Sequence, residues 1–102
     1  MIDNLLKDAL KEIAILKKLN HKNVIKLFEI IHHDDESLIY LILECVSNGC
    51  ILEYNQDENT FSINKAYTIN NPDKTDYTEE EIKDFIRDIV LGLDYCKFIF
   101  NF

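Results

Sequence analysis

The chain has 102 residues, of which two are glycine and one is proline. The glycines, Gly49 and Gly92, lie too far apart to form the G-x-G-x-x-G loop of a dinucleotide-binding fold or a Walker A motif, so these phosphate-binding loops are excluded. The formal net charge of −8 argues against nucleic acid as a partner, because its phosphate backbone would be repelled.

The composition indicates a small globular chain. It is 47% hydrophobic and 29% charged, and no apolar run approaches the roughly 20 residues of a membrane span. The N-terminus has no basic stretch followed by an apolar core, so we expect a cytoplasmic protein that makes no membrane contact. The three cysteines, Cys45, Cys50 and Cys96, have no framework spacing and are expected to be reduced thiols.

The first predicted element is an amphipathic helix over residues 3–20. Its apolar positions recur at helical spacing: Leu6, Ala9, Leu10, Ile13, Leu16 and Leu19. Lys17 and Lys18 suit the negative end of the helix dipole. The polar run at residues 20–23 is expected to end the helix.

Two β-branched, apolar segments follow, at residues 24–31 and 38–46. The short polar connection between them predicts an antiparallel hairpin. Because both strands are apolar at nearly every position, we expect both faces of the hairpin to be covered. The acidic run Asp34-Asp35-Glu36 is expected to be a solvated loop.

The region after the hairpin loses its periodicity. Residues 47–49 are a break signal, and residues 51–54 are expected to form a short turn of helix. Residues 55–77 contain five asparagines and the single proline, Pro72, and predict an irregular, solvated insert.

The last predicted element is a long amphipathic helix over residues 78–97. Thr78 and Glu81 have the spacing of a capping box, in which each side chain accepts from the other residue's backbone N–H. The apolar stripe that follows consists of Ile82, Phe85, Ile86, Ile89, Val90 and Leu93.

The order of these elements, and the letters of residues 12–27, resemble a protein kinase domain. Residues 12–27 are similar to the segment from helix C to strand 4, where the usual pattern is E-I-x-I-L-K-K-L-x-H-P-N-V-V-K-L. Residues 38–46 then resemble strand 5 and the hinge, and residues 78–95 resemble helix E. The stretch 44–53 is similar to the hinge of calcium/calmodulin-dependent protein kinase kinases, which reads like E-L-V-N-Q-G-P-V-M-E.

The resemblance implies an α+β, partial protein-kinase-like fold over residues 1–102: helix C, a two-stranded antiparallel hairpin (strands 4 and 5), hinge, insert and helix E. Residues 1–46 would be the back half of the small lobe with the hinge. Residues 55–77 would be an asparagine-rich insert, and residues 78–97 the first long helix of the large lobe.

Four residues fall on family site positions. Glu12 falls on the helix C glutamate, which pairs in the family with a lysine that positions the nucleotide phosphates. Leu43 falls on the gatekeeper position behind the adenine pocket. The backbone carbonyl of Glu44 and the backbone groups of Val46 fall where the hinge hydrogen-bonds adenine. ATP and Mg²⁺ are the implied cofactors, and protein serine or threonine is the implied substrate.

Other sequence elements of the kinase family are missing from this sequence. Eleven residues precede Glu12, too few for the glycine-rich strands and the strand 3 lysine. The single arginine, Arg87, excludes an H-R-D motif, and no D-F-G occurs, so neither a catalytic aspartate nor a metal ligand can be named. We therefore expect the isolated chain to be inactive.

The chain also departs from the family pattern at single positions. Lys22 and Cys50 stand where prolines are usual, and the pattern is lost from Cys96 onward, which predicts a truncated kinase. Three interpretations remain: part of a serine/threonine kinase, a non-catalytic protein-interaction module, or an ATP-binding pseudokinase remnant. In each of them we expect exposed apolar surface, instability of the isolated chain and self-association or binding of a partner chain.

Non-functional interpretations of the same residues also remain open. Glu12 taken alone reads as a solvated helix residue. The histidines and cysteines match no zinc spacing, so no metal site is expected.

Overall fold

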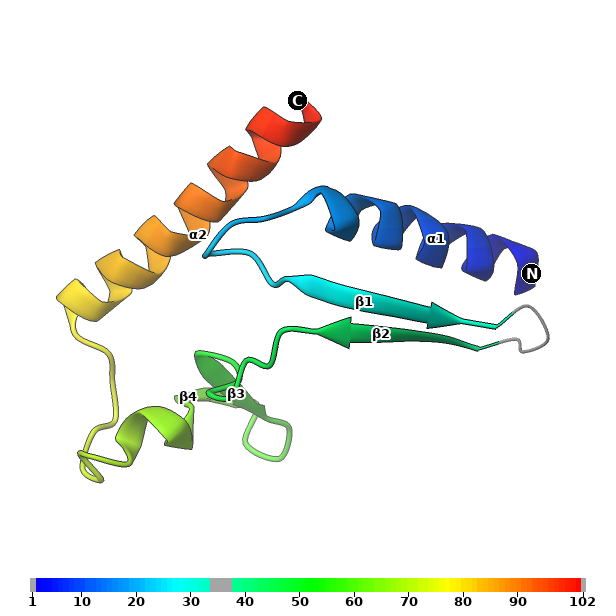
Figure 1. Ribbon diagram of the computed structural model, residues 1–102. Coiled ribbons are helices and arrows are strands. Elements are labelled where there is room, and N and C mark those ends of the chain that lie inside the picture. Colours follow the sequence, from blue (N-terminus) through cyan, green and yellow to red (C-terminus); the bar gives the residue numbers. More distant parts are fainter. Residues whose placement is uncertain (1, 34–37, 102) are drawn as a thin grey trace. The chain divides into compact units, whose positions relative to one another are not determined.

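The computed structural model describes the backbone of residues 2–33 and 38–101 (Figure 1). The expected solvated loop at Asp34-Asp35-Glu36 lies outside these residues. The chain divides into two compact units, Met1–Cys45 with Asp88–Phe102, and Val46–Arg87. No helix within the described residues is long and apolar enough to cross a membrane.

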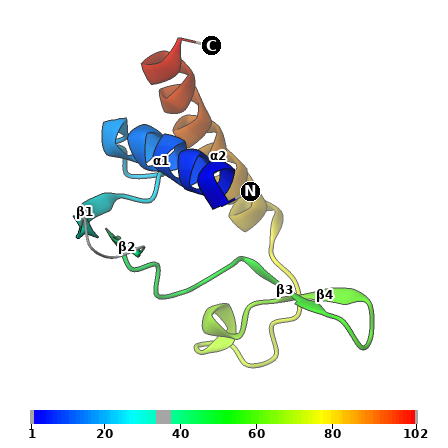
Figure 2. The same ribbon diagram turned by 90° about the vertical axis from the view of Figure 1, so that its right-hand side faces the viewer.

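The first unit contains helix α1 (Ile2–Lys18) and a hairpin of β1 (Leu27–His32) and β2 (Ile39–Leu43). The two strands are antiparallel, so the predicted helix and hairpin are confirmed. Helix α1 runs beside the hairpin in both views (Figures 1 and 2). The most buried apolar side chains of this unit are Ile13 at 7% exposure and Leu19 at 8%, both on the apolar stripe of the predicted helix.

The hairpin is irregular near its open end. Leu27 pairs with Leu43 and Glu29 with Ile42, which leaves one extra residue, Phe28, on β1. Such a bulge bends the strand and shifts its alternation by one position. Apolar side chains on both sides of the bulge can therefore face the same way.

The expectation that both faces of this hairpin are covered is wrong for the structure described. Phe28 is 61% exposed and Tyr40 is 51% exposed, and three consecutive residues of β2, Leu41, Ile42 and Leu43, are also exposed. The two apolar runs therefore form strands as expected, but one helix cannot cover both faces of the sheet that they make.

The last turns of α2 (Glu79–Phe100) also belong to the first unit, where they contact the loop after α1. The Tyr95 hydroxyl accepts from the backbone N–H of Asn20 at 2.9 Å. The Tyr95 ring stacks on His21 with centroids 5.0 Å apart. The polar loop that we expected to end the first helix therefore also docks on the last one.

The second unit contradicts part of the expected irregular insert, whereas residues 69–77 hold no helix or strand. Strand β3 (Leu52–Asn55) pairs antiparallel with β4 (Thr60–Ile63), and a 3-10 helix, η1 (Lys65–Thr68), follows. The expected turn of helix at 51–54 is likewise wrong. The structure thus has two hairpins where the sequence suggested one.

Asparagines form the turn of the new hairpin. The Asn55 side chain accepts from the backbone N–H groups of Asp57 at 3.0 Å and Glu58 at 3.3 Å. Asn59 adopts a left-handed φ of 52°, a conformation that asparagine tolerates better than most residues. This exposed tract therefore forms an ordered turn between two short strands.

An aromatic cluster of Tyr67, Tyr77 and Phe85 organises the rest of the second unit. The Tyr77 and Phe85 rings meet edge to face with centroids 5.0 Å apart, and Tyr67 contacts both at longer distances. The Tyr77 hydroxyl donates to the Ile51 carbonyl at 2.5 Å. Desolvation, with smaller contributions from neighbouring Tyr67 and Glu81, raises the pKa of Tyr77 above its ordinary value.

The capping box at the start of α2 is confirmed. The Glu81 N–H donates to the Thr78 hydroxyl at 3.2 Å, and the Thr78 N–H donates to the Glu81 carboxylate at 3.1 Å. The Lys74 ammonium also contacts this carboxylate at 2.6 Å. The hydrogen bond from Lys74 and that from the Thr78 backbone lower the pKa of Glu81 below its ordinary value.

The expected end of the last helix near residue 97 is too early. Helix α2 continues to Phe100 and stops before Asn101, whose φ of 55° is left-handed. The segment after Cys96 contains neither glycine nor proline, so nothing in it interrupts a helix, and Asn101 is a suitable C-terminal cap residue.

Candidate functional site

Glu12 lies on α1, beside the hairpin. It lines a hollow of about 140 Å³ together with Ala9 and Ile13 of the same helix and with Ile39 and Leu41 of β2. The helix presents a solvent-exposed Glu12 next to the otherwise apolar lining of this hollow.

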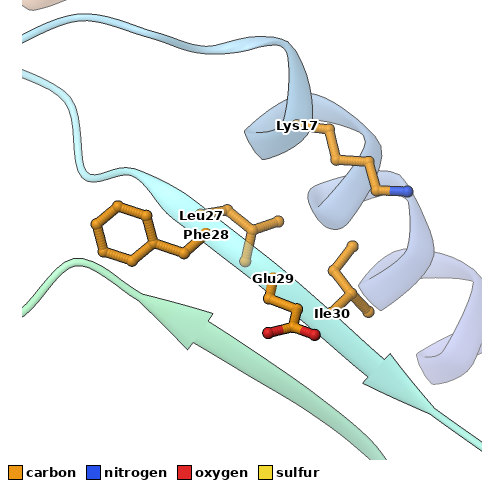
Figure 3. A pocket seen from close by; sticks show the side chains of 5 residues that line it. All are labelled: Lys17, Leu27, Phe28, Glu29 and Ile30. Atoms are coloured by element: carbon orange, nitrogen blue, oxygen red, sulfur yellow. The ribbon is translucent and has the colours of Figure 1, made fainter.

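A second hollow of about 260 Å³ lies between α1 and β1 and is lined by Lys17, Leu27, Phe28, Glu29 and Ile30 (Figure 3). Figure 3 shows Leu27 and Ile30 directed toward α1, and Phe28 directed away from it. Leu27 and Ile30 are three residues apart, so the bulge at Phe28 is what places them on the same side. This hollow is separate from the four residues named by the resemblance.

Leu43 ends β2 and pairs with Leu27 at the start of β1. Its side chain is exposed. The register holds Leu43 at the point where the strand leaves the hairpin.

Glu44 is joined to the segment just before β1 by two hydrogen bonds to one residue. Its backbone N–H donates to the Lys26 carbonyl at 2.7 Å, and its carboxylate accepts from the Lys26 N–H at 3.2 Å. The backbone and the side chain of Glu44 therefore both hydrogen-bond to the backbone of Lys26. The sequence analysis named only the Glu44 carbonyl and missed this contact, because nothing in the letters links residues 26 and 44 except the register of the hairpin.

Val46 begins the second unit, whereas Leu43 and Glu44 belong to the first. The Val46 carbonyl accepts from the Gly49 N–H at 3.1 Å in a turn. Gly49 adopts a φ of 67°, and a Cβ there would lie 3.2 Å from the Asn64 amide nitrogen, so the turn favours glycine. The Val46 carbonyl therefore already accepts one hydrogen bond within the turn.

The described residues offer no metal centre. Between residues 2–33 and 38–101, no three histidine, cysteine, aspartate or glutamate side chains come together in a way that could hold an ion. The cysteines Cys45, Cys50 and Cys96 are free thiols.

The structure has a helix beside an antiparallel strand pair, and a second, capped helix later in the chain. A model of the protein kinase domain matches residues 2–98, and the chain belongs to this family. The structure accordingly has a partial protein-kinase-like α+β fold.

Curated relatives are serine/threonine kinases. The chain is 36% identical over 92 residues to a probable serine/threonine-protein kinase of Dictyostelium discoideum, covering 90% of this chain and 10% of that protein. It is 33% identical over 88 residues to a calcium/calmodulin-dependent protein kinase kinase of Caenorhabditis elegans, covering 86% of this chain and 13% of that protein. A serine/threonine-protein kinase of Schizosaccharomyces pombe is 34% identical, covering 86% of this chain and 11% of that protein.

The chain therefore spans only 10 to 13% of the length of these relatives. No solved structure matches it.

Proposed function

We propose that the chain is part of an ATP-dependent serine/threonine protein kinase domain and supplies its helix C glutamate and hinge. The observation that carries this proposal is the match to the protein kinase domain over residues 2–98, which includes Glu12 and residues 43–46. The family reaction transfers the γ-phosphoryl group of ATP to a serine or threonine of a protein. Catalysis of this reaction is mainly positioning and electrostatic stabilisation.

Each site residue has a role in this proposal. Glu12 would bind the ammonium of a lysine that holds the nucleotide phosphates, beside the hollow that Glu12 lines with Ile39 and Leu41. Leu43 would close the back of the adenine pocket. The Glu44 carbonyl would accept from the adenine amino group, and the Val46 N–H would donate to the adenine ring.

The residues present fit an adenine-binding hinge better than they fit Mg²⁺. The two bonds between Glu44 and Lys26 support the hinge assignment because they hold residue Glu44 in place at the end of the hairpin. The described residues offer no ligand set for a cation, so we assign none. We propose that the 102-residue chain does not transfer phosphate on its own, because its sequence contains neither an H-R-D nor a D-F-G motif.

A chimeric kinase tests this function. Residues 2–98 would replace the matching segment of the C. elegans calcium/calmodulin-dependent protein kinase kinase, which supplies every other kinase element. We expect the chimera to phosphorylate a peptide substrate, and the isolated chain to incorporate no phosphate from labelled ATP. An inactive but folded chimera would refute the proposal.

Variants of the chimera test the roles of the residues. Glu12→Gln should lower kcat/KM by about 100-fold, because a misplaced phosphate-binding lysine disturbs the reacting geometry. Asp8→Asn, one helical turn earlier on the exposed surface, is the matched control and should leave kcat/KM unchanged. Equal effects of the two substitutions would contradict the role proposed for Glu12.

A non-catalytic interaction module is the second candidate. The exposed apolar residues Ile86, Ile89 and Leu93 on α2 favour it, because apolar surface of this extent is typical of an interface. Sedimentation of the isolated chain over a range of concentrations would show self-association. A monomer at all concentrations that also binds no other protein would exclude this candidate.

A further inference from the structure

The hairpin of β3 and β4 has one apolar face. Leu52 pairs with Ile63, and Tyr54 pairs with Phe61. Directly opposed residues of antiparallel strands lie on the same face, and so do residues two apart, so these four side chains form one surface. The intervening pairs, such as Glu53 with Ser62, lie on the opposite face.

The aromatic part of this face is open to solvent. Tyr54 is 49% exposed and Phe61 is 68% exposed, although their rings contact each other with centroids 5.0 Å apart. The Tyr54 hydroxyl donates to the Asn59 side chain, which draws the polar end of the ring toward the turn. A two-stranded hairpin is marginal unless its apolar face is covered, so a covering partner would stabilise it.

The charged residues of the hairpin have one sign. Residues 52–63 contain three carboxylates, those of Glu53, Asp57 and Glu58, and no lysine, arginine or histidine. Residues 46–87 contain nine acidic and four basic residues. An acidic partner would be repelled from this surface, whereas a basic one would be attracted.

A hollow along the hairpin brings carboxylate residues together with Tyr54 and with residues of the opposite face. Its volume is about 540 Å³, and its lining includes the carboxylate residues Glu53 and Asp57 beside Tyr54, with Lys65 also present. Aromatic faces and carboxylates are both favourable surroundings for arginine and lysine side chains.

We propose that the β3–β4 hairpin is a docking surface for a basic, apolar polypeptide segment. The apolar side chains of the segment cover Tyr54 and Phe61, and its cationic side chains reach Asp57 and Glu58 in the turn beside this face. This inference does not rest on the proposed kinase function, because it uses only the hairpin and its charge.

The first test uses the whole chain and defined peptides. The probe is a fluorescein-labelled peptide of alternating leucine and lysine, and binding is followed by fluorescence anisotropy. The controls are peptides of alternating leucine and glutamate and of alternating serine and lysine. We expect both controls to bind at least about tenfold more weakly than the probe, and the affinity for the probe to fall with added salt. Equal binding of the leucine–glutamate peptide would overturn the proposal.

Substitutions then locate the site. Tyr54→Ser combined with Phe61→Ser should weaken binding of the leucine–lysine peptide at least about tenfold. Ile86→Ser combined with Ile89→Ser is the matched control, since both isoleucines are exposed apolar residues of α2, and it should change affinity by less than about twofold. Equal losses in the two double variants would mean that any exposed apolar surface suffices, and would overturn the proposal.

A charge variant separates the loss of the binding surface from unfolding of the hairpin. In Asp57→Asn combined with Glu58→Gln, the two backbone N–H bonds to Asn55 can still form, because they involve no side-chain atom of residues 57 or 58. This variant should also bind the peptide more weakly, and its remaining affinity should depend less on salt. If instead the apolar face pairs two copies of this chain, dimerisation would be lost in the Tyr54/Phe61 variant and no peptide would bind, which would overturn the proposal.

Discussion

Gly92 of α2 lies against the backbone of Asn23, in the loop that follows α1. A Cβ added to Gly92 would lie 2.9 Å from the Asn23 carbonyl oxygen and 3.5 Å from the Val24 side chain. An atom that close to a backbone oxygen cannot be accommodated by a side-chain rotation. The absence of a side chain at residue 92 is therefore what allows the loop to dock on the helix.

Gly92→Ala should weaken this contact although alanine is the better helix former. The substitution gains about 1 kcal/mol of helix propensity, and the overpacking costs about 1–3 kcal/mol. We expect faster hydrogen exchange of the amides at residues 20–24, with increased helicity of α2 in isolation. Exchange measured by mass spectrometry or NMR tests this.

Leu93→Ala is the control for Gly92→Ala, because Leu93 is an exposed neighbour on the same helix. It should leave exchange at residues 20–24 unchanged. If Gly92→Ala instead protected these amides, the close approach to Asn23 would not be the reason for the glycine.

Tyr95→Phe should release one backbone amide of the same loop. The substitution removes the hydroxyl that accepts from the Asn20 N–H at 2.9 Å and keeps a ring to stack on His21. The loss should be about 1 kcal/mol, the usual net value of one hydrogen bond, and should appear as faster exchange of the Asn20 amide. Tyr95→Ala should have a larger effect, since it also removes the stacked ring; equal effects would mean that the hydroxyl carries the whole contact.

The elements with regular apolar periodicity could be predicted from the sequence. The stripe that contains Ile13 and Leu19 predicted α1, although Leu6 and Leu10 of the same stripe are exposed. The spacing of Thr78 and Glu81 predicted the start of α2. The second hairpin was missed because Leu52, Tyr54, Phe61 and Ile63 are separated by a run of turn residues. Only the pairing of Tyr54 with Phe61 reveals their alternation as a shared face.

Thr78→Ala should fray the first turn of α2. It removes the hydroxyl that accepts from the Glu81 N–H, and the loss of such a cap costs about 0.5–2 kcal/mol. We expect faster exchange at residues 79–82. Thr78→Ser should behave like the parent chain, and Thr75→Ala, whose hydroxyl lies outside the cap, should do so as well. A frayed helix in Thr75→Ala would argue against the cap as the cause.

The candidate site was predictable only as far as family positions allow. Glu12, Leu43, Glu44 and Val46 could be named because their neighbours in the sequence follow a known pattern. The bond of the Glu44 carboxylate to the Lys26 N–H depends on the bulged register of the hairpin, and the occupied Val46 carbonyl depends on the turn at Gly49. Both are three-dimensional facts that no local pattern encodes.

Acid should loosen the start of α2 through Glu81. Its pKa is held below the ordinary 4.5, first by the Lys74 hydrogen bond and then by the Thr78 backbone. A carboxyl whose folded pKa is lowered stabilises fully above its unfolded pKa and loses that stabilisation as the pH falls through the folded value. Protection at residues 79–82 should therefore be constant above about pH 5 and should decline below about pH 4.5.

Glu81→Gln isolates this effect. The variant should be less protected at neutral pH and should lose the acid-dependent step, whereas Glu80→Gln should retain the step. A step of unchanged size in Glu81→Gln would assign it to another carboxyl.

The isolated chain should unfold without a sharp transition. Among residues 4–33 and 38–101, the buried hydrophobic side chains are Ile13 and Leu19, whereas Phe61 and Phe98 and many aliphatic residues are exposed. Cooperative unfolding requires a shared core whose loss exposes much apolar surface at once, and this chain has little such core to lose. We expect a broad thermal transition in calorimetry and strong binding of the dye ANS before heating. A purified monomer that unfolds in one narrow transition would refute this expectation.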